Sequence, residues 1–103
     1  MWAQLIRTRL KTGHEGDLPR LMAELEAVEQ PGSGLVRSLA MRDQRDPNEV
    51  YMLVVFESEE KARARENDPR REEGLQAARA MMADSFDGPP QFVDLTVVEE
   101  LAP

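Results

Sequence analysis

The alternation of apolar and polar residues along this chain predicts four β-strands. Residues 2–10 alternate with a period of two, and residues 35–42 and 49–57 form a second and a third such segment, joined by a short polar loop. Residues 91–99 give a fourth segment rich in valine and other apolar residues. Because successive side chains of a strand point to opposite faces, this period indicates strands rather than helices. The central pair is therefore predicted to form a hairpin.

The third of these segments is the most informative part of the sequence. Val50, Met52 and Phe56 would lie on one face of this strand, and Tyr51 and Leu53 on the other. Both faces are thus apolar, whereas a strand with one face in water usually carries polar residues on that face. We therefore expect both faces of this strand to be covered in the folded protein.

A different period, that of a helix, predicts a first helical segment between the first two strands. Asp17 is placed to act as the N-cap, and Pro19 falls in the first turn, where its missing N–H is not needed. The following apolar residues recur at helical spacing and form one stripe: Leu18, Leu21, Met22, Leu25 and Val28. The breaker sequence of residues 31–34 then ends the helix.

A second helical region is predicted between the third and fourth strands. It begins at Ser58 and restarts at Asp68 and Pro69, an N-cap followed by proline at the first helical position. Its apolar stripe is formed by Leu75, Ala78, Met82 and Phe86. The Gly-Pro-Pro sequence of residues 88–90 ends it before the last strand.

The resulting order, βαββαβ, predicts the α+β fold class with a ferredoxin-like architecture in a single domain, residues 1–103. Such a chain builds a four-stranded antiparallel sheet with the helices on one face. The other face then needs a cover, and a second copy of the chain is the obvious one. Each large apolar side chain left bare would forgo roughly 1.5–3 kcal/mol, so we expect a homodimer.

Composition narrows the function classes further. The chain has no cysteine, which excludes a disulfide framework, an iron–sulfur site and a thiol nucleophile. Its net charge of −7 disfavours nucleic acid and anionic membrane surfaces as partners. No apolar segment is long enough to span a bilayer, and the first residues do not have the pattern of a signal peptide, so a cytoplasmic location is expected.

Four short segments resemble one known family. They are LKTGH (residues 10–14), PGSGLV (31–36), VVFESEEKA (54–62) and NDPR (67–70). Together with the order of elements, they make residues 3–98 similar to the antibiotic biosynthesis monooxygenase (ABM) domain of the dimeric α/β-barrel superfamily. The resemblance implies the same fold and a dimer. It also implies, as in some members, cofactor-free oxygen chemistry on polycyclic phenols.

The resemblance does not carry over a set of catalytic residues. The positions that match the tryptophan, asparagine and tyrosine of the active oxygenases are Phe56, Met52 and Ala62. The arginine of those enzymes falls near Leu75 or Gln76. The catalytic residues therefore remain unassigned.

Haem-degrading relatives place an asparagine, a tryptophan and a histidine ligand at positions that fall near Ile6, Ala64 and Gly74. The only histidine, His14, lies in a predicted turn far from that ligand position, where a solvated loop residue is the simpler interpretation. No haem, metal or other cofactor is therefore expected.

Residues on the helix-facing side of the predicted sheet could form a pocket for a small aromatic ligand. Methionine-rich walls adapt to flat apolar ligands, but plain core packing would use the same residues. The predicted ligand-binding residues are Gln4, Ile6, Met52, Phe56, Met82 and Phe86.

Arginines in the first two strands form a second candidate group: Arg7, Arg9, Arg37 and Arg42. They are either in ion pairs with acids such as Asp94 or form a clamp for an acidic or phenolic ligand.

Two functions follow from the sequence. The first is a monooxygenase that acts without metal or haem on a small aromatic or polyketide-like substrate. The alternative is a dimeric ligand-binding or accessory domain without turnover, because the aligned catalytic positions are not retained.

Overall fold

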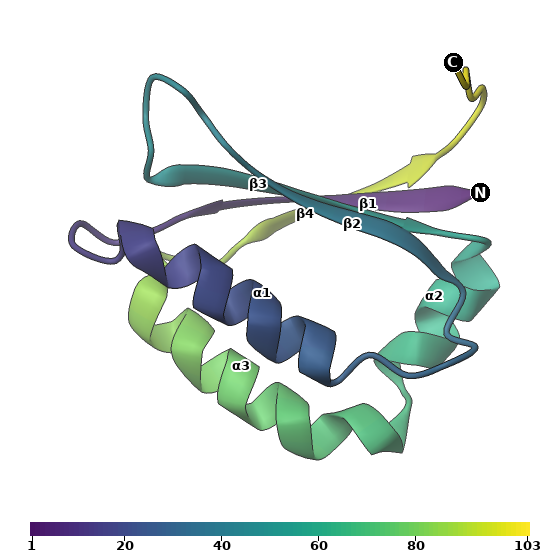
Figure 1. The fold of residues 1–103 in the computed structure, drawn as a ribbon, viewed down its shortest axis with the longest axis horizontal. Helices are drawn as coiled ribbons and strands as arrows, with labels where there is room; N and C mark the ends of the chain where they lie inside the picture. The colour runs from purple at the N-terminus through teal and green to yellow at the C-terminus, as the bar shows by residue number, and fades with distance from the viewer.

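A computed structural model describes residues 1–103 and contains one sheet with helices on one side (Figure 1). The strands are β1 (Trp2–Arg9), β2 (Leu35–Arg42), β3 (Glu49–Phe56) and β4 (Gln91–Thr96). The helices are α1 (Leu18–Ala27), α2 (Glu59–Glu66) and α3 (Glu72–Ser85), and the 3₁₀ turns η1 (Glu15–Asp17) and η2 (Pro69–Arg71) precede α1 and α3. The predicted interruption of the second helical region is therefore present, as the turn between α2 and α3.

The sheet has the strand order β2-β3-β1-β4, and every neighbouring pair is antiparallel. Trp2 of β1 lies opposite Phe56 of β3 on one side and opposite Thr96 of β4 on the other. These pairs define the register of β3, β1 and β4. The predicted ferredoxin-like α+β fold is confirmed. β2 and β3 pair as a hairpin, whereas β1 lies between β3 and β4, neither of which follows it directly in sequence.

The two faces of the sheet differ in what covers them. In Figure 1, α1 and α3 lie side by side below the sheet, and α2 lies at the end of the sheet where β1 begins. The even-numbered residues of β1 and β3 share the helix-covered face, since Leu10 and Val50 pack with residues of α1 and α3. The opposite face carries no element. Its exposed or half-buried apolar side chains include Leu39, Met41, Leu53, Val55, Val93 and Leu95.

The apolar interior is divided into two clusters. The large cluster lies under α1 and α3 and consists of Leu10, Leu18, Leu21, Val50, Ala78 and Phe86. The small cluster lies at the α2 end and consists of Trp2, Phe56 and Ala62. The rings of Trp2 and Phe56 are tilted by 43°, with their centroids 6.0 Å apart. The large and small clusters are therefore the two packed ends of one helix-covered face.

Two local details differ from the sequence-based expectation. Asp17 precedes α1 but its side chain does not cap the helix, because η1 already holds Asp17 in a helical backbone conformation. Its carboxylate instead accepts a hydrogen bond from Ser85 Oγ at 2.7 Å. The last strand ends at Thr96, not at residue 99, because β1 begins at Trp2 and only one further backbone hydrogen bond, from the Val97 N–H to the Met1 carbonyl, follows. No helix has the length and apolar character needed to cross a bilayer.

Candidate functional site

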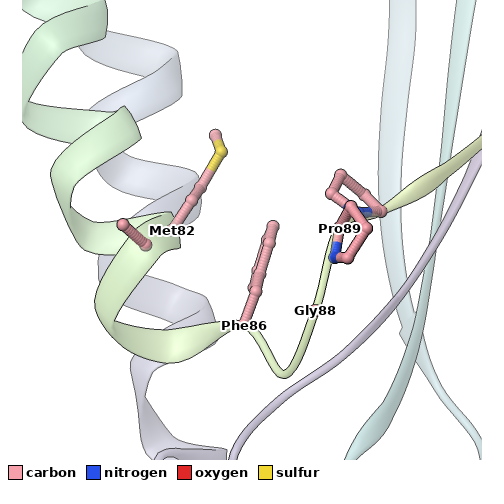
Figure 2. Close-up of a pocket in the computed structure, with 6 residues that line it drawn as sticks. Met82, Phe86, Gly88 and Pro89 are labelled. Atoms are coloured by element: carbon pink, nitrogen blue, oxygen red, sulfur yellow. The ribbon is translucent and has the colours of Figure 1, made fainter.

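An apolar groove lies between the end of α3 and the segment that leads into β4. Its volume is about 410 Å³. Figure 2 shows the ring of Phe86 facing Pro89 across the groove, with Met82 one turn earlier on α3. The residues that line it are Met82, Ala83, Phe86, Gly88, Pro89 and Pro90. The groove presents no ionisable side chain, so it suits the flat apolar part of a ligand.

The sequence after α3 explains why the groove exists. The Asp87 N–H donates to the Arg9 carbonyl at 2.7 Å, and Gln91 pairs with Arg7, so three residues of this segment lie opposite one residue of β1. The segment must therefore bow away from β1. Gly88 has a φ of +88°, which favours glycine, and the prolines that follow have no N–H to donate to β1. The chain thus leaves a hollow on each side of Pro89.

The hollow on the other side of Pro89 is polar and has a volume of about 260 Å³. It is lined by Arg7, Thr8, Arg9, Glu49, Asp87, Pro89 and Gln91. Arg7 Nε lies 2.6 Å from Glu49 Oε1, and Arg9 Nη1 lies 2.6 Å from Asp46 Oδ2. The pKa values of both guanidinium groups are raised, chiefly by these hydrogen bonds. The ion pairs expected for Arg7 and Arg9 are therefore present, but their partners are Glu49 and Asp46 and not Asp94.

The other two candidate arginines behave differently. Arg42 donates to the backbone carbonyl of Glu15, and Arg37 is exposed without an ion pair. The four arginines therefore do not converge on one ligand, and the structure gives no support to a clamp made of all four.

The six predicted ligand-binding residues lie on the helix-covered side but in three places. Met82 and Phe86 line the groove. Ile6 lies opposite Met52 in the β1–β3 register and opposite Phe92 of β4, whose side chain is 59% exposed. Ile6 and Phe92 thus form an apolar cross-strand pair, and neither of them lines the groove.

The remaining predicted residues are packed or hydrogen-bonded. Met52 and Phe56 are buried, and the ring of Phe56 lies against Trp2. Gln4 is half-buried, and its side-chain amide donates to Asp94 Oδ1 at 3.0 Å. None of these three lines the groove.

Gln4 belongs to a polar group that sequence reasoning missed. Arg63 of α2 donates to Asp94 Oδ2 at 2.9 Å, and its guanidinium carbon lies 5.0 Å from the centre of the Trp2 ring. The hydrogen bonds from Gln4 and Arg63 lower the pKa of Asp94. The β1–β4 register, which sets Gln4 opposite Asp94, is the signal that would have revealed this group.

Three of the positions aligned with catalytic residues of active oxygenases are apolar and buried in the structure. Phe56 and Ala62 belong to the small cluster, and Met52 is also buried. Neither candidate for the arginine position, Leu75 or Gln76, carries a charge. These positions therefore supply no group that could move a proton.

The single histidine, His14, pairs with an aspartate of the neighbouring turn. Its Nδ1 lies 2.8 Å from Asp17 Oδ2, the same oxygen that accepts from Ser85, so histidine and serine are both bound to the aspartate and not to each other. The structure contains no group of three or more side chains placed to hold a metal ion.

Solved structures share this fold over nearly the whole chain. A protein of Nitrosomonas europaea, provisionally named an antibiotic biosynthesis monooxygenase, superimposes with a TM-score of 0.75 at 15% identity, covering 96% of this chain and 100% of the other. A similarly named protein of Deinococcus radiodurans gives a TM-score of 0.73 at 12% identity, with 100% and 98% covered. The fold is that of the ABM proteins.

One of these structures has a described activity. A mutant of SnoaB, a cofactor-independent oxygenase from Streptomyces nogalater, gives a TM-score of 0.67 at 19% identity, with 99% of this chain and 97% of SnoaB covered. No family model matches the sequence, and no curated protein matches it. At these identities the likeness establishes the fold, and the activity has to be argued from the site.

Proposed function

We propose that this chain is a cofactor-free monooxygenase for a small aromatic or polyketide-like substrate, held in the groove between α3 and β4. The observation that carries the proposal is the groove itself. It has an apolar lining of Met82, Phe86 and Pro89 and a volume that accommodates a fused-ring compound. The whole-chain likeness to a cofactor-independent oxygenase supports the same reaction class.

The chemistry must come largely from the substrate, because no ionisable side chain lines the groove. An electron-rich methylene next to a phenol can be oxidised to a carbonyl by O₂. One oxygen atom enters the carbonyl, the other leaves as water with the two methylene hydrogens, and the substrate supplies all four electrons. The groove would orient the ring and shield the reacting carbon from bulk water. Activity should then rise with pH through the pKa of the substrate phenol.

A second candidate function is binding without turnover. It is favoured by the buried apolar side chains of Phe56, Met52 and Ala62 at the positions aligned with catalytic residues. The same groove would then hold an aromatic ligand for transport or for presentation to another protein. Both candidates need the groove, but only the first needs O₂ consumption.

One pair of variants tests the groove and separates the candidates. Ala83 is exposed and lines the groove, whereas Ala80 is exposed on the same helix and does not line it. Ala83→Phe should weaken binding of an anthrone or naphthoquinol at least tenfold, and Ala80→Phe should leave it unchanged. Oxygen uptake above the uncatalysed rate that is lost only in Ala83→Phe would support the monooxygenase. Binding without uptake would favour the second candidate, and equal binding by both variants would exclude this groove.

We also infer that the chain forms a homodimer through the sheet face that carries no helix. The exposed side chains of Leu39, Met41, Val93 and Leu95 lie on this face, and covering them with a second copy would remove them from water. Native mass spectrometry should find a dimer, and Leu39→Lys combined with Met41→Lys should give a folded monomer. A wild-type monomer at tens of micromolar protein would contradict this inference.

A further inference from the structure

The chain beyond β4 leaves the body of the molecule. The Val97 N–H makes the last backbone hydrogen bond of this segment, and the residues after it make none. Val98 is 88% exposed and Leu101 is 95% exposed, more than any other large apolar side chain of the protein. In Figure 1 the segment rises on the side of the sheet that faces away from the helices. We call residues 97–101 the arm.

The composition of the arm does not suit a segment that stays in water. Valine favours extended backbone, so Val97 and Val98 predispose the arm to pair as a strand. Bare apolar side chains such as those of Val98 and Leu101 are stabilised when they are removed from water, and nothing within the same chain covers them. The arm therefore has the properties of a strand whose partner lies in another molecule.

The far edge of the sheet has the matching properties. β2 is an edge strand, and no strand lies on its outer side. Beyond a bulge at its start, β2 follows β3 in regular register from Arg37 to Arg42, so its outer edge offers an ordered row of backbone N–H and C=O groups. Proteins often protect such edges with lysine or proline, and β2 contains neither. Its side chains of Val36, Leu39 and Met41 are 41–47% exposed. β2 is thus open to the addition of a strand.

The arm and β2 also carry opposite charges that have no partner within the chain. Glu99 and Glu100 of the arm are exposed and form no ion pair. The same holds for Arg37 of β2 and for Arg45 in the loop that follows β2. Since the protein as a whole is acidic, this basic edge is a local exception that attracts an acidic segment.

We propose that the arm binds the β2 edge of a second copy of this chain, whose own arm binds back in the same way. The proposal rests on the homodimer inferred above and identifies the segment that closes it. The arm would add an outer strand to the sheet of the other copy, with its five residues opposite the six of Arg37–Arg42. Val98 and Leu101 would then leave water against the apolar side chains of β2. A two-fold axis forms this contact twice, so the assembly closes at two copies.

A pair of charge variants tests the contact between copies. Glu99→Lys with Glu100→Lys gives the arm the charge of β2, and Arg37→Glu gives β2 the charge of the arm. Each variant alone should dimerise more weakly than wild type, by about tenfold in Kd, because like charges then meet. Mixed in equal amounts, the two should form the heterodimer in preference to either homodimer, since both of its contacts join opposite charges. Native mass spectrometry with one variant labelled with ¹⁵N separates the three species.

The matched control is Glu26→Lys with Glu73→Lys. It makes the same change in net charge at exposed positions of α1 and α3, away from the arm. This control should dimerise like wild type and should show no preference for Arg37→Glu. A random mixture of homodimers and heterodimers from the arm variant, or an equal preference shown by the control, would overturn the proposal.

The apolar side chains of the arm give a second measurement. Val98→Ser with Leu101→Ser should raise the Kd of the dimer about tenfold, measured by sedimentation. The arm residues after Val97 make no hydrogen bond with the body of their own chain, so these substitutions should leave its fold intact. A dimer of unchanged Kd would overturn the role of the arm and leave the homodimer itself standing. A wild-type monomer would overturn the homodimer and the arm with it.

Discussion

The two core clusters lie at opposite ends of the same helix-covered face of the sheet, and different kinds of side chain cover them. The large cluster is closed by apolar side chains of two long helices, such as Leu18 and Leu21 of α1 and Ala78 of α3. The small cluster is closed by the short helix α2, which contributes one buried residue, Ala62, and two arginines. Arg63 lies over the Trp2 ring at 5.0 Å, and Arg65 lies over the Phe56 ring at 5.3 Å.

Because of this difference, the two ends of the molecule should respond differently to salt and pH. Apolar packing between α1 and α3 contains no charge that salt could screen or acid could titrate. We call the two arginines over the small cluster, Arg63 and Arg65, the arginine lid. Their ion pairs are screened by salt and are lost when acid protonates the carboxylates. The apolar groove borders the large cluster, through Phe86, so the proposed ligand site shares the apolar character of its surroundings.

The strongest test of the comparison is a cavity in the large cluster. Leu21 is 1% exposed, so Leu21→Ala should lower the free energy of unfolding by about 2–5 kcal/mol, measured by urea denaturation. The half-buried Leu25 of the same helix is the control, and Leu25→Ala should cost clearly less. Equal losses would show that Leu21 is no better packed than Leu25.

The close approach of α1 and α3 is tested at Gly74. A Cβ at this position would lie 2.0 Å from Val28 Cγ1, so the helices meet here without room for a methyl group. Gly74→Ala should destabilise the protein by about 1–3 kcal/mol, although alanine is the better helix former by about 1 kcal/mol. Adding Val28→Ala should recover part of the loss in a double-mutant cycle. A single Gly74→Ala variant that is more stable than wild type would contradict this packing.

Most of the fold could be predicted because its signals are local. The alternation in residues 49–57 and the breaker at residues 31–34 each fix an element within a few residues, and α3 begins close to Asp68 and Pro69 as expected. The polar group around Asp94 could not be predicted, because Gln4, Arg63 and Asp94 meet only through strand pairing and the position of α2.

The candidate site was predicted only in part, for a related reason. Met82 and Phe86 follow from the apolar stripe of α3, but Pro89 and Pro90 appear in sequence only as a helix breaker. They become the facing wall because three residues lie opposite one residue of β1. Met52 and Phe56 carry the same apolar pattern but are packed into the interior, which a pattern of hydrophobic residues cannot distinguish from a pocket wall.

The arginine lid is tested at Arg63. Arg63→Ala removes the cation over Trp2 and the bond to Asp94, and it should lower the stability only slightly, because the guanidinium group is exposed to solvent. Trp2 is the only tryptophan, so its emission should shift to longer wavelength as water reaches the ring. Arg79→Ala is the control, since Arg79 forms an ion pair with Glu72 on α3. An unchanged emission spectrum would mean that Arg63 does not cover the ring.

The smallest effect is expected from acid at the α2–α3 junction. Hydrogen bonds from Arg70, first from its side chain and then from its N–H, lower the pKa of Asp68 from 3.8 to about 2. A carboxyl whose pKa is lower in the folded state stabilises the fold above its ordinary pKa and loses that contribution as pH falls through the folded value. The contribution of Asp68 should thus be complete above pH 3.8 and should disappear towards pH 2.

Asp68→Asn keeps a capping side chain but cannot titrate, so the difference in unfolding free energy between wild type and this variant should shrink over that interval. Glu73→Gln, at an exposed position of α3 without an ion pair, should show no such trend. A wild-type-to-Asp68→Asn difference that stays constant from pH 5 to pH 2 would show that Arg70 does not hold the Asp68 carboxylate in solution, and that the charged end of the molecule is less ordered than its apolar end.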